Sequence, residues 1–176
     1  TAKLLWGVYL LLTLAETLLL KFVGKMDWFD SICHSFATVA TGGFSTHTAS
    51  VGAFDSVAVD AIIMLFMFLS GINFSLHHSA LTGRPVRYLK DPECRAYCLI
   101  LAGCGLFMTL NIWVGGYGTL ARCLRDAFFT GISVLTTTGF CTADFDRWPD
   151  ASRLLLVILM FVGACAGSTG GGMKIV

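Results

Sequence analysis

The sequence predicts an all-α polytopic membrane protein made of tandem helix–pore loop–helix repeats. Three observations support this fold class. Of the 176 residues, 56% are hydrophobic and 13% are charged, whereas soluble domains carry about 25% charged residues. Four apolar segments are long enough to approach the ~20 residues that cross a bilayer. A polar motif occurs twice, each time between two of these segments, so the chain has an internal repeat.

The apolar segments order the chain into two repeats. The four segments are Leu4–Leu20, Val57–Leu76, Ala96–Val114 and Leu154–Gly172. One polar motif lies between the first and second segments and the other between the third and fourth. We therefore predict a first repeat over residues 1–81, a basic loop over 82–95 and a second repeat over 96–176. We expect both ends of the sequence to be cuts inside a longer protein.

The duplicated motif is a short amphipathic segment that ends in a Thr/Gly turn and a Phe. Its copies read DSICHSFATVATGGF at residues 30–44 and DAFFTGISVLTTTGF at residues 126–140. The difference of 96 between Asp30 and Asp126 also separates Phe44 from Phe140 and Gly71 from Gly167. Polar backbone at membrane depth is tolerated only where protein buries it or where it lines a water-filled path. The pattern indicates an ion pore.

The first copy predicts a helix of about 11 residues over Phe29–Val39, roughly 16 Å long at 1.5 Å per residue. A helix that spans half the bilayer points the negative end of its dipole at the midplane, which favours a cation. We expect Asp30 and Asp126 to cap the starts of the two half-helices. We expect Phe44 and Phe140 to wedge the turns against surrounding helices.

The turns themselves supply oxygen ligands. Glycine reaches positive φ without a Cβ penalty, so Gly43 and Gly139 can each turn a carbonyl toward an axis. Rings of carbonyls replace the hydration shell of a potassium-sized ion. The predicted selectivity filter is Thr41, Gly42, Gly43, Thr137, Thr138 and Gly139, with K⁺ held at Thr41, Gly43, Thr137 and Gly139.

The connection between the repeats carries Arg84, Arg87, Lys90 and Arg95, a cluster typical of the cytoplasmic side. This orientation places the pore loops outside. Two readings of Glu16, a carboxyl deep in the first span, remain open. It is a functional intramembrane acid that pairs with Asn73 or a threonine, or it makes a helix-packing hydrogen bond or lies nearer the interface than counting suggests. We expect His77 and His78 to be interfacial.

These residues resemble the Trk/Ktr/HKT superfamily of potassium transporters, most closely the bacterial Trk-type membrane subunit. The resemblance covers essentially all 176 residues and rests on residues 40–46 (ATGGFST), 71–77 (GINFSLH), 136–140 (TTTGF) and 163–174 (GACAGSTGGGMK). Family members carry four such repeats around one pore, and this chain resembles the second and third.

The resemblance implies potassium uptake across the plasma membrane, the bacterial inner membrane, by a multi-pass protein. It implies a homodimer, a cytosolic nucleotide-binding regulatory subunit, and filter glycines at Gly43 and Gly139. It also implies a broken helix beneath the filter, whose loop acts as an intramembrane gate. That gate is Gly167, Ser168, Thr169, Gly170, Gly171 and Gly172, a run in which each helical Gly costs about 1 kcal/mol against Ala.

Other function classes fit the sequence less well. A sodium-permeable member of the same superfamily and a cation-coupled secondary transporter, which also uses broken helices, remain the alternatives. The sequence lacks HExxH and GxSxG motifs and paired carboxylates at depth, so we expect no enzyme. Met173 follows Gly172 where a phosphate-binding loop needs Lys. We expect no cofactor other than transported K⁺, contact with membrane lipid, and no nucleic-acid partner.

Overall fold

The fold comes from a computed structural model, which describes residues 2–175. Thr1 and Val176, the outer ends of the two predicted repeats, lie outside the described residues. Five helical elements precede the basic loop: α1 (Ala2–Phe22), α2 (Trp28–Val39), the 3₁₀ helix η1 (Ser50–Phe54), α3 (Val57–Ser70) and α4 (Phe74–Leu81). The rest of the chain forms α5 (Arg87–Lys90), α6 (Pro92–Val114), α7 (Leu120–Leu135), the 3₁₀ helix η2 (Phe145–Arg147), α8 (Asp150–Phe161), β1 (Val162–Cys165) and β2 (Met173–Ile175).

Two described helices, α1 over Leu5–Phe22 and the whole of α6, are long and apolar enough to cross a membrane. The predicted segment Val57–Leu76 is not one straight span. It divides into α3 and α4, which meet at an angle of 101°. Asn73 starts the new helix, since its side chain accepts a hydrogen bond from the Ser75 amide at 2.9 Å. The pair counts as a third span only if the bend is included.

The predicted segment Leu154–Gly172 is also interrupted. Helix α8 ends at Phe161, and the chain continues as β1, which pairs in parallel with β2 across the glycine-rich loop. The fold is therefore mostly helical rather than all-α. Within the predicted loop 82–95 the chain forms the short helix α5, and α6 begins at Pro92 after its N-cap Asp91.

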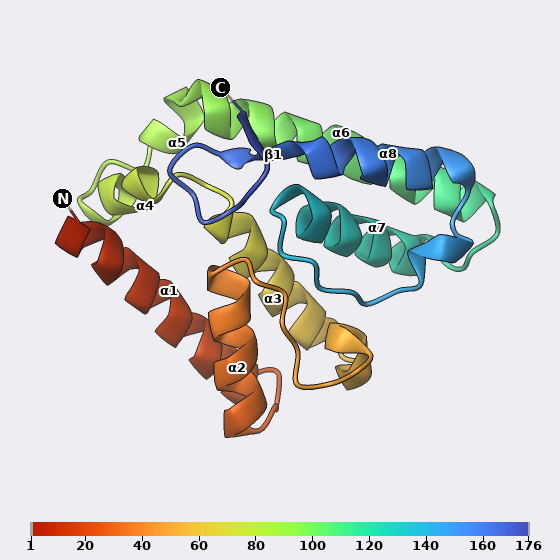
Figure 1. Cartoon of the computed structure of the whole chain (residues 1–176), viewed down its shortest axis with the longest axis horizontal. Helices are drawn as coiled ribbons and strands as arrows, with labels where there is room; N and C mark the ends of the chain where they lie inside the picture. The colour runs from red at the N-terminus through yellow and green to blue at the C-terminus, as the bar shows by residue number, and fades with distance from the viewer. Residues whose placement is uncertain (1, 176) are drawn as a thin grey trace.

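The two repeats pack on each other through a shared core. Figure 1 shows α6 and α8 lying side by side along one edge with α7 against them, while α1 and α2 lie at the other end and α3 runs between the two groups. The fully buried side chains of this core include Ile63 and Met67 on α3, Tyr97 on α6, and Phe129 and Leu135 on α7. Because these residues come from both repeats, the repeats form one packed unit.

The starts of α2 and α7 differ from the prediction. The α2 amides are capped by Asp27, whose carboxylate accepts from the Asp30 amide at 2.7 Å. The α7 amides are capped by Thr119, whose hydroxyl accepts from the Arg122 amide at 3.4 Å. The predicted capping roles of Asp30 and Asp126 are wrong. Each helix begins before these aspartates, so their side chains lie past the N-cap and bind other groups.

Candidate ion-binding site

The turns that follow α2 and α7 have the same backbone conformation. Thr41 and Thr137 both lie at positive φ (51° and 60°), and so do Gly43 and Gly139 (66° and 89°). A positive φ is uncommon for threonine, which carries a β-branch. The strained positions recur at the 96-residue separation of the motif. The two turns therefore have equivalent backbone structures in the two repeats.

The hydrogen bonds of the turns also recur in register. The Thr41 amide donates to Thr38 O at 2.9 Å, and the Thr137 amide donates to Val134 O at 3.0 Å. The amides of Gly42 and Gly43 both donate to Ala37 O, and those of Thr138 and Gly139 both donate to Ser133 O. Each turn thus satisfies its amide groups on the last turn of its own helix.

The carbonyls of the turns are left free by this arrangement. Among residues 2–175, no hydrogen bond is accepted by the carbonyl oxygens of the six predicted filter positions: Thr41, Gly42, Gly43, Thr137, Thr138 and Gly139. Thr41 and Thr138 are buried, Gly43 and Thr137 are half-buried, and Gly42 and Gly139 are exposed. Buried backbone carbonyls are nearly always paired with protein, water or an ion, so the free carbonyls of Thr41 and Thr138 are candidates to bind another group.

The two turns touch each other. A Cβ built on Gly43 would lie 1.9 Å from Thr138 O, a distance that no real side chain tolerates. The main chains of the two repeats therefore approach as closely as glycine permits. The same construction on Gly139 meets nothing within 4 Å, so that glycine faces open space in this chain.

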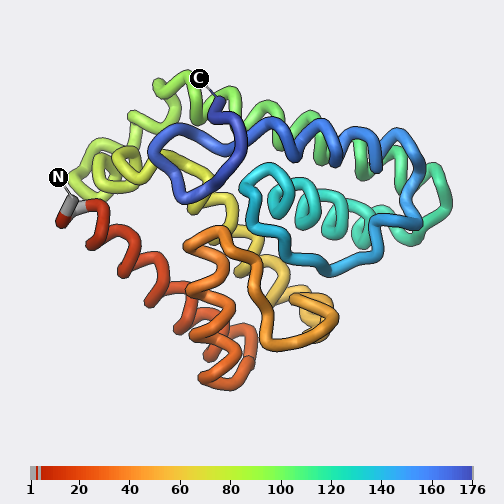
Figure 2. The backbone as a smooth tube through the Cα atoms, in the orientation of Figure 1, coloured from red at the N-terminus to blue at the C-terminus, as the bar shows by residue number. Residues whose placement is uncertain are grey.

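The glycine-rich segment 166–172, which we call the gate loop, lies against both turns. Thr41 Oγ1 donates to Thr169 O at 3.0 Å, and the Gly171 amide donates to Thr137 Oγ1 at 2.7 Å. The gate loop therefore binds the two threonines that begin the turns. Figure 2 shows this loop as the dark blue bend beside the junction of α3 and α4.

The junction of α3 and α4 holds the other side of the gate loop. The Thr169 amide donates to Ser70 O at 3.3 Å, the Cys165 amide donates to Gly71 O at 3.1 Å, and the Phe74 amide donates to Gly167 O at 3.0 Å. The bend in the first repeat frees backbone groups of residues 70–74. The gate loop of the second repeat satisfies them.

Two charged side chains also hold the gate loop. Glu93, in the first turn of α6, accepts from the Ala166 amide at 3.1 Å. The Lys174 ammonium donates to Gly170 O and lies 3.5 Å from Ser168 Oγ. A pocket of about 410 Å³ opens beside Gly167–Thr169, walled by the apolar side chains of α1 and by Phe74. The loop is thus fixed on its α6 side and open on its α1 side.

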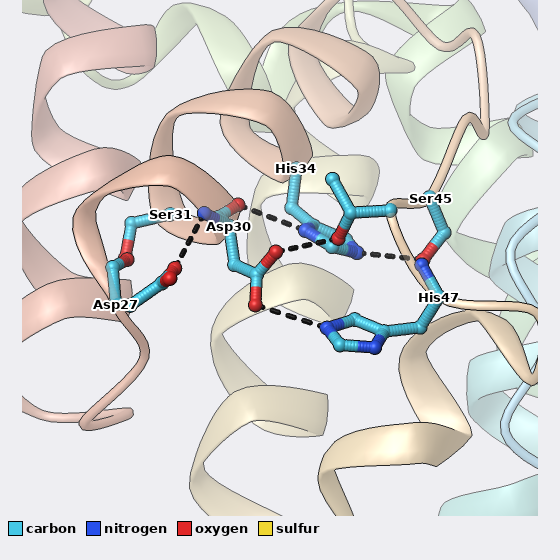
Figure 3. Close-up of polar contacts among 7 residues, drawn as sticks. Asp27, Asp30, Ser31, His34, Ser45 and His47 are labelled. Atoms are coloured by element: carbon cyan, nitrogen blue, oxygen red, sulfur yellow. Dashed lines mark hydrogen bonds and ion pairs between the residues drawn. The ribbon is translucent and has the colours of Figure 1, made fainter.

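The N-terminal end of α2 carries a polar cluster (Figure 3). Asp30 accepts from Thr46 Oγ1 at 2.5 Å and pairs with His47 Nε2 at 2.9 Å, while His34 Nε2 meets Ser45 Oγ at 2.9 Å. Burial alone would raise the pKa of Asp30, but the hydrogen bonds from Thr46 and His47 outweigh it and lower this pKa. The cluster ties residues 45–47, which follow the first turn, back onto α2.

The two motif phenylalanines differ. Phe140 is 1% exposed and stacks on His34 of the first repeat, with ring centroids 5.7 Å apart, so it wedges the second turn as predicted. Phe44 is 81% exposed, and the prediction that it packs against surrounding helices is wrong within this chain. The pocket for Phe140 is built by the neighbouring repeat, and the described residues offer Phe44 no such neighbour.

The structure brings together most of the predicted site and adds residues that the sequence did not single out. The filter and gate positions lie in one contact network, which Ser70, Asn73 and Glu93 complete. Asn73 lies at the gate loop, since a Cβ on Gly167 would be 2.9 Å from Asn73 Oδ1, and the Glu16 carboxyl makes no hydrogen bond to it. His77 is buried and bound to Tyr88 Oη and Leu69 O, so its side chain faces the protein. The shared register of Gly71 and Gly167 was the available signal that the α3–α4 junction and the gate loop are related positions, which the structure places in contact.

Comparisons with known proteins agree with these features. The family model described as TrkH, a cation transport protein, matches residues 1–176. The Trk system potassium uptake protein TrkH of Escherichia coli K12 is 47% identical over all of this chain and 37% of its own length. TrkG of the same organism is 35% identical over 99% of the chain and 36% of its own length. These relatives are transporters, not enzymes.

A solved structure gives the same answer. The crystal structure of the potassium transporter TrkH from Vibrio parahaemolyticus superposes with a TM-score of 0.94 at 44% identity, covering 99% of this chain and 38% of that one. The chain thus spans little more than a third of the relatives it matches. Sequence identity, family match and backbone agree along its full length. The chain belongs to the TrkH family of cation transport proteins.

Proposed function

We propose that this chain contributes two of the pore-lining segments of a potassium uptake protein, with K⁺ passing the free carbonyls of the turns after α2 and α7. The observation that carries the proposal is the unpaired state of those carbonyls in two turns of identical conformation that touch each other. The relatives named as potassium uptake proteins support K⁺ as the ion. Because the chain spans about 37% of such a relative, the pore itself belongs to the longer protein.

The gate loop obstructs this path in the conformation described. Its main chain binds Thr41 and Thr137 at once, so an ion leaving the turns meets the loop before it reaches the other side. Opening requires these two hydrogen bonds and those to residues 70–74 to break or move together. We place the protein in the bacterial inner membrane with the turns facing outward, as a homodimer under the control of a cytosolic nucleotide-binding subunit.

The test is cation uptake by the full-length protein in vesicles or in cells without other potassium uptake systems. Gly43→Ser and Gly139→Ser each replace a positive-φ glycine, and we expect each to lower Rb⁺ uptake and the preference for K⁺ over Na⁺. Gly103→Ser is the matched control, since its Cβ would meet nothing within 4 Å and its backbone is helical. Uptake and ion preference that are unchanged in both filter variants would refute the assignment.

A further inference from the structure

Glu16 is a buried carboxyl that the proposed ion path does not use. It lies on the face of α1 that also carries Thr13, Thr17 and Leu20, and this face packs on α2. Glu16 is 0% exposed, and neither carboxyl oxygen makes a hydrogen bond within residues 2–175. A buried polar group without a partner is costly, and an ionisable one inside a membrane is functional by default hypothesis.

The hydroxyl groups at the α1–α2 interface have no hydrogen atom to spare for a carboxylate. Thr13 and Thr17 donate to the carbonyls of Tyr9 and Thr13 on α1 itself, at 2.9 and 2.8 Å. Ser35 donates across the interface to Thr13 O at 2.6 Å. Thr38, the hydroxyl that the Glu16 carboxyl approaches, donates to His34 O at 2.7 Å. These hydroxyl oxygens can still accept a hydrogen bond.

Nor does a charged group balance an ionised Glu16. Among the described residues no ion pair includes it, and the buried titratable groups on the three helices packed against α1 have their own partners. On α2, His34 binds Asp30 O and Ser45; on α3, Asp60 pairs with Arg125; on α4, His77 binds Leu69 O and Tyr88. An interface that offers acceptors but neither donors nor cations favours a protonated carboxyl, which donates.

The second repeat supplies a natural comparison. Thr109 donates to Gly105 O at 2.7 Å just as Thr13 donates to Tyr9 O, so α1 and α6 share the 96-residue register. In that register Glu16 corresponds to Ile112, which is 0% exposed, and Thr38 corresponds to Val134. The second repeat therefore fills the same space with two uncharged side chains. The site tolerates a neutral group and does not require a charge.

We propose that Glu16 is a protonated carboxyl that donates a hydrogen bond to the Thr38 hydroxyl and thereby positions the last turn of α2. This inference rests on the proposed filter, because Thr38 O accepts the amide of Thr41, the first residue of the turn. Glu16 touches no ion. It is a positioning residue that holds the end of the first half-helix, and its proton stays bound throughout transport.

The experiment uses the full-length protein with three changes at this site. Glu16→Gln keeps a neutral donor of the same size and should leave Rb⁺ uptake and K⁺/Na⁺ preference within about twofold of the parent. Glu16→Leu removes the donor and should lower the K⁺/Na⁺ preference by about tenfold. The double variant Glu16→Ile, Thr38→Val copies the second repeat and should recover part of that loss. Ile112→Leu is the control in the other repeat.

A second measurement does not depend on transport. Subtracting the infrared spectrum of Glu16→Gln from that of the parent, both at neutral pH, should leave the carbonyl band of a protonated carboxylic acid. A Gln variant as impaired as the Leu variant, or a difference spectrum without that band, would overturn the inference. Loss of uptake in Gly43→Ser and Gly139→Ser alongside either result would leave the proposed filter standing, so the two failures are distinguishable.

Discussion

In the first repeat Asp30 binds Thr46 and His47, which follow the first Thr/Gly turn, whereas in the second repeat the corresponding Asp126 binds arginines of its own helix. The residues that correspond to Thr46 and His47 are Thr142 and Ala143, so the second turn has no histidine to pair. Instead Arg125 joins Asp126 to Asp60 on α3, with Nε–O distances of 3.5 Å to both. The motif aspartate therefore binds residues of its own repeat in the first copy. In the second copy it is linked through Arg125 to Asp60 of the other repeat.

The backbone of the two turns does not share this divergence. Their positive-φ positions and the acceptors of their amides agree residue by residue. The path of the backbone in the turns is therefore the same in the two repeats, while the side chains and the polar network around the turns differ.

The second helices of the repeats diverge in a complementary way. Helix α3 ends at Ser70 and a new helix starts at Phe74, whereas α8 ends at Phe161 and is followed by a strand and the gate loop. The bend in one repeat supplies hydrogen-bond partners for the loop in the other. The second helix of each repeat is thus interrupted in its own way, and the two interruptions bind each other.

The largest effect we expect is a difference in stability between variants of Asp126 and of Asp30. Asp126 is 2% exposed and neutralises two arginines, so Asp126→Asn should lower the free energy of unfolding by about 2–3 kcal/mol. Asp30→Asn should lower it by about 0.5–1 kcal/mol, since that pair is partly exposed. Thermal unfolding of the full-length protein in detergent measures both. Equal losses of unfolding free energy in the two variants would show that the two aspartates stabilise the fold to the same extent, against this comparison.

The next prediction concerns the bend in α3. A Cβ on Gly71 would lie 2.5 Å from Tyr97 Oη and 3.0 Å from Thr136 Cγ2, so Gly71→Ala should cost about 1–3 kcal/mol by overpacking. Removing the hydroxyl with Tyr97→Phe should recover part of this loss, because the shortest clash disappears. Thermal unfolding of the single and double variants checks the coupling. Simple additivity of the two changes would contradict this account of the bend.

The gate loop should respond to loss of its tether on α6. Glu93→Ala removes one hydrogen bond to the loop, worth about 1 kcal/mol, and should raise basal Rb⁺ uptake about fivefold. Glu93→Gln keeps a side-chain carbonyl that can accept from the Ala166 amide and is the matched control. Unchanged or lower uptake in Glu93→Ala, with normal expression, would mean that this bond does not hold the loop closed.

The smallest effect is the pH dependence of the contact of Asp30 with Thr46 and His47. The pKa of Asp30 is lowered from 3.8 when the protein folds, so the ionised carboxylate adds stability above that value. This contribution is lost as the pH falls through the lowered pKa of the folded state. The difference in melting temperature between the parent and Asp30→Asn should be constant near neutral pH and shrink in acid. A difference that grows in acid would have the wrong sign.

Much of the candidate site could be predicted because its signals are local. The order Thr, Gly and Phe after an amphipathic segment, repeated at one spacing, located both turns and the positive-φ glycines Gly43 and Gly139, but not the positive φ of Thr41 and Thr137. The glycine run correctly excluded a regular helix over 167–172. The helix caps were mislocated, since Asp27 and Thr119 compete with Asp30 and Asp126 as N-caps and composition alone does not rank them.

The sequence by itself determined the duplication, the membrane character of the chain and the place of the two turns, because these depend on hydrophobic length, on the repeat spacing and on glycines that tolerate positive φ. Only the tertiary structure decided that α3 bends at Gly71, that the freed backbone of residues 70–74 pairs with the gate loop, and that Phe140 is buried while Phe44 is not. Such choices are made by partners about one hundred residues away along the chain. No local pattern records which partner a backbone group will find.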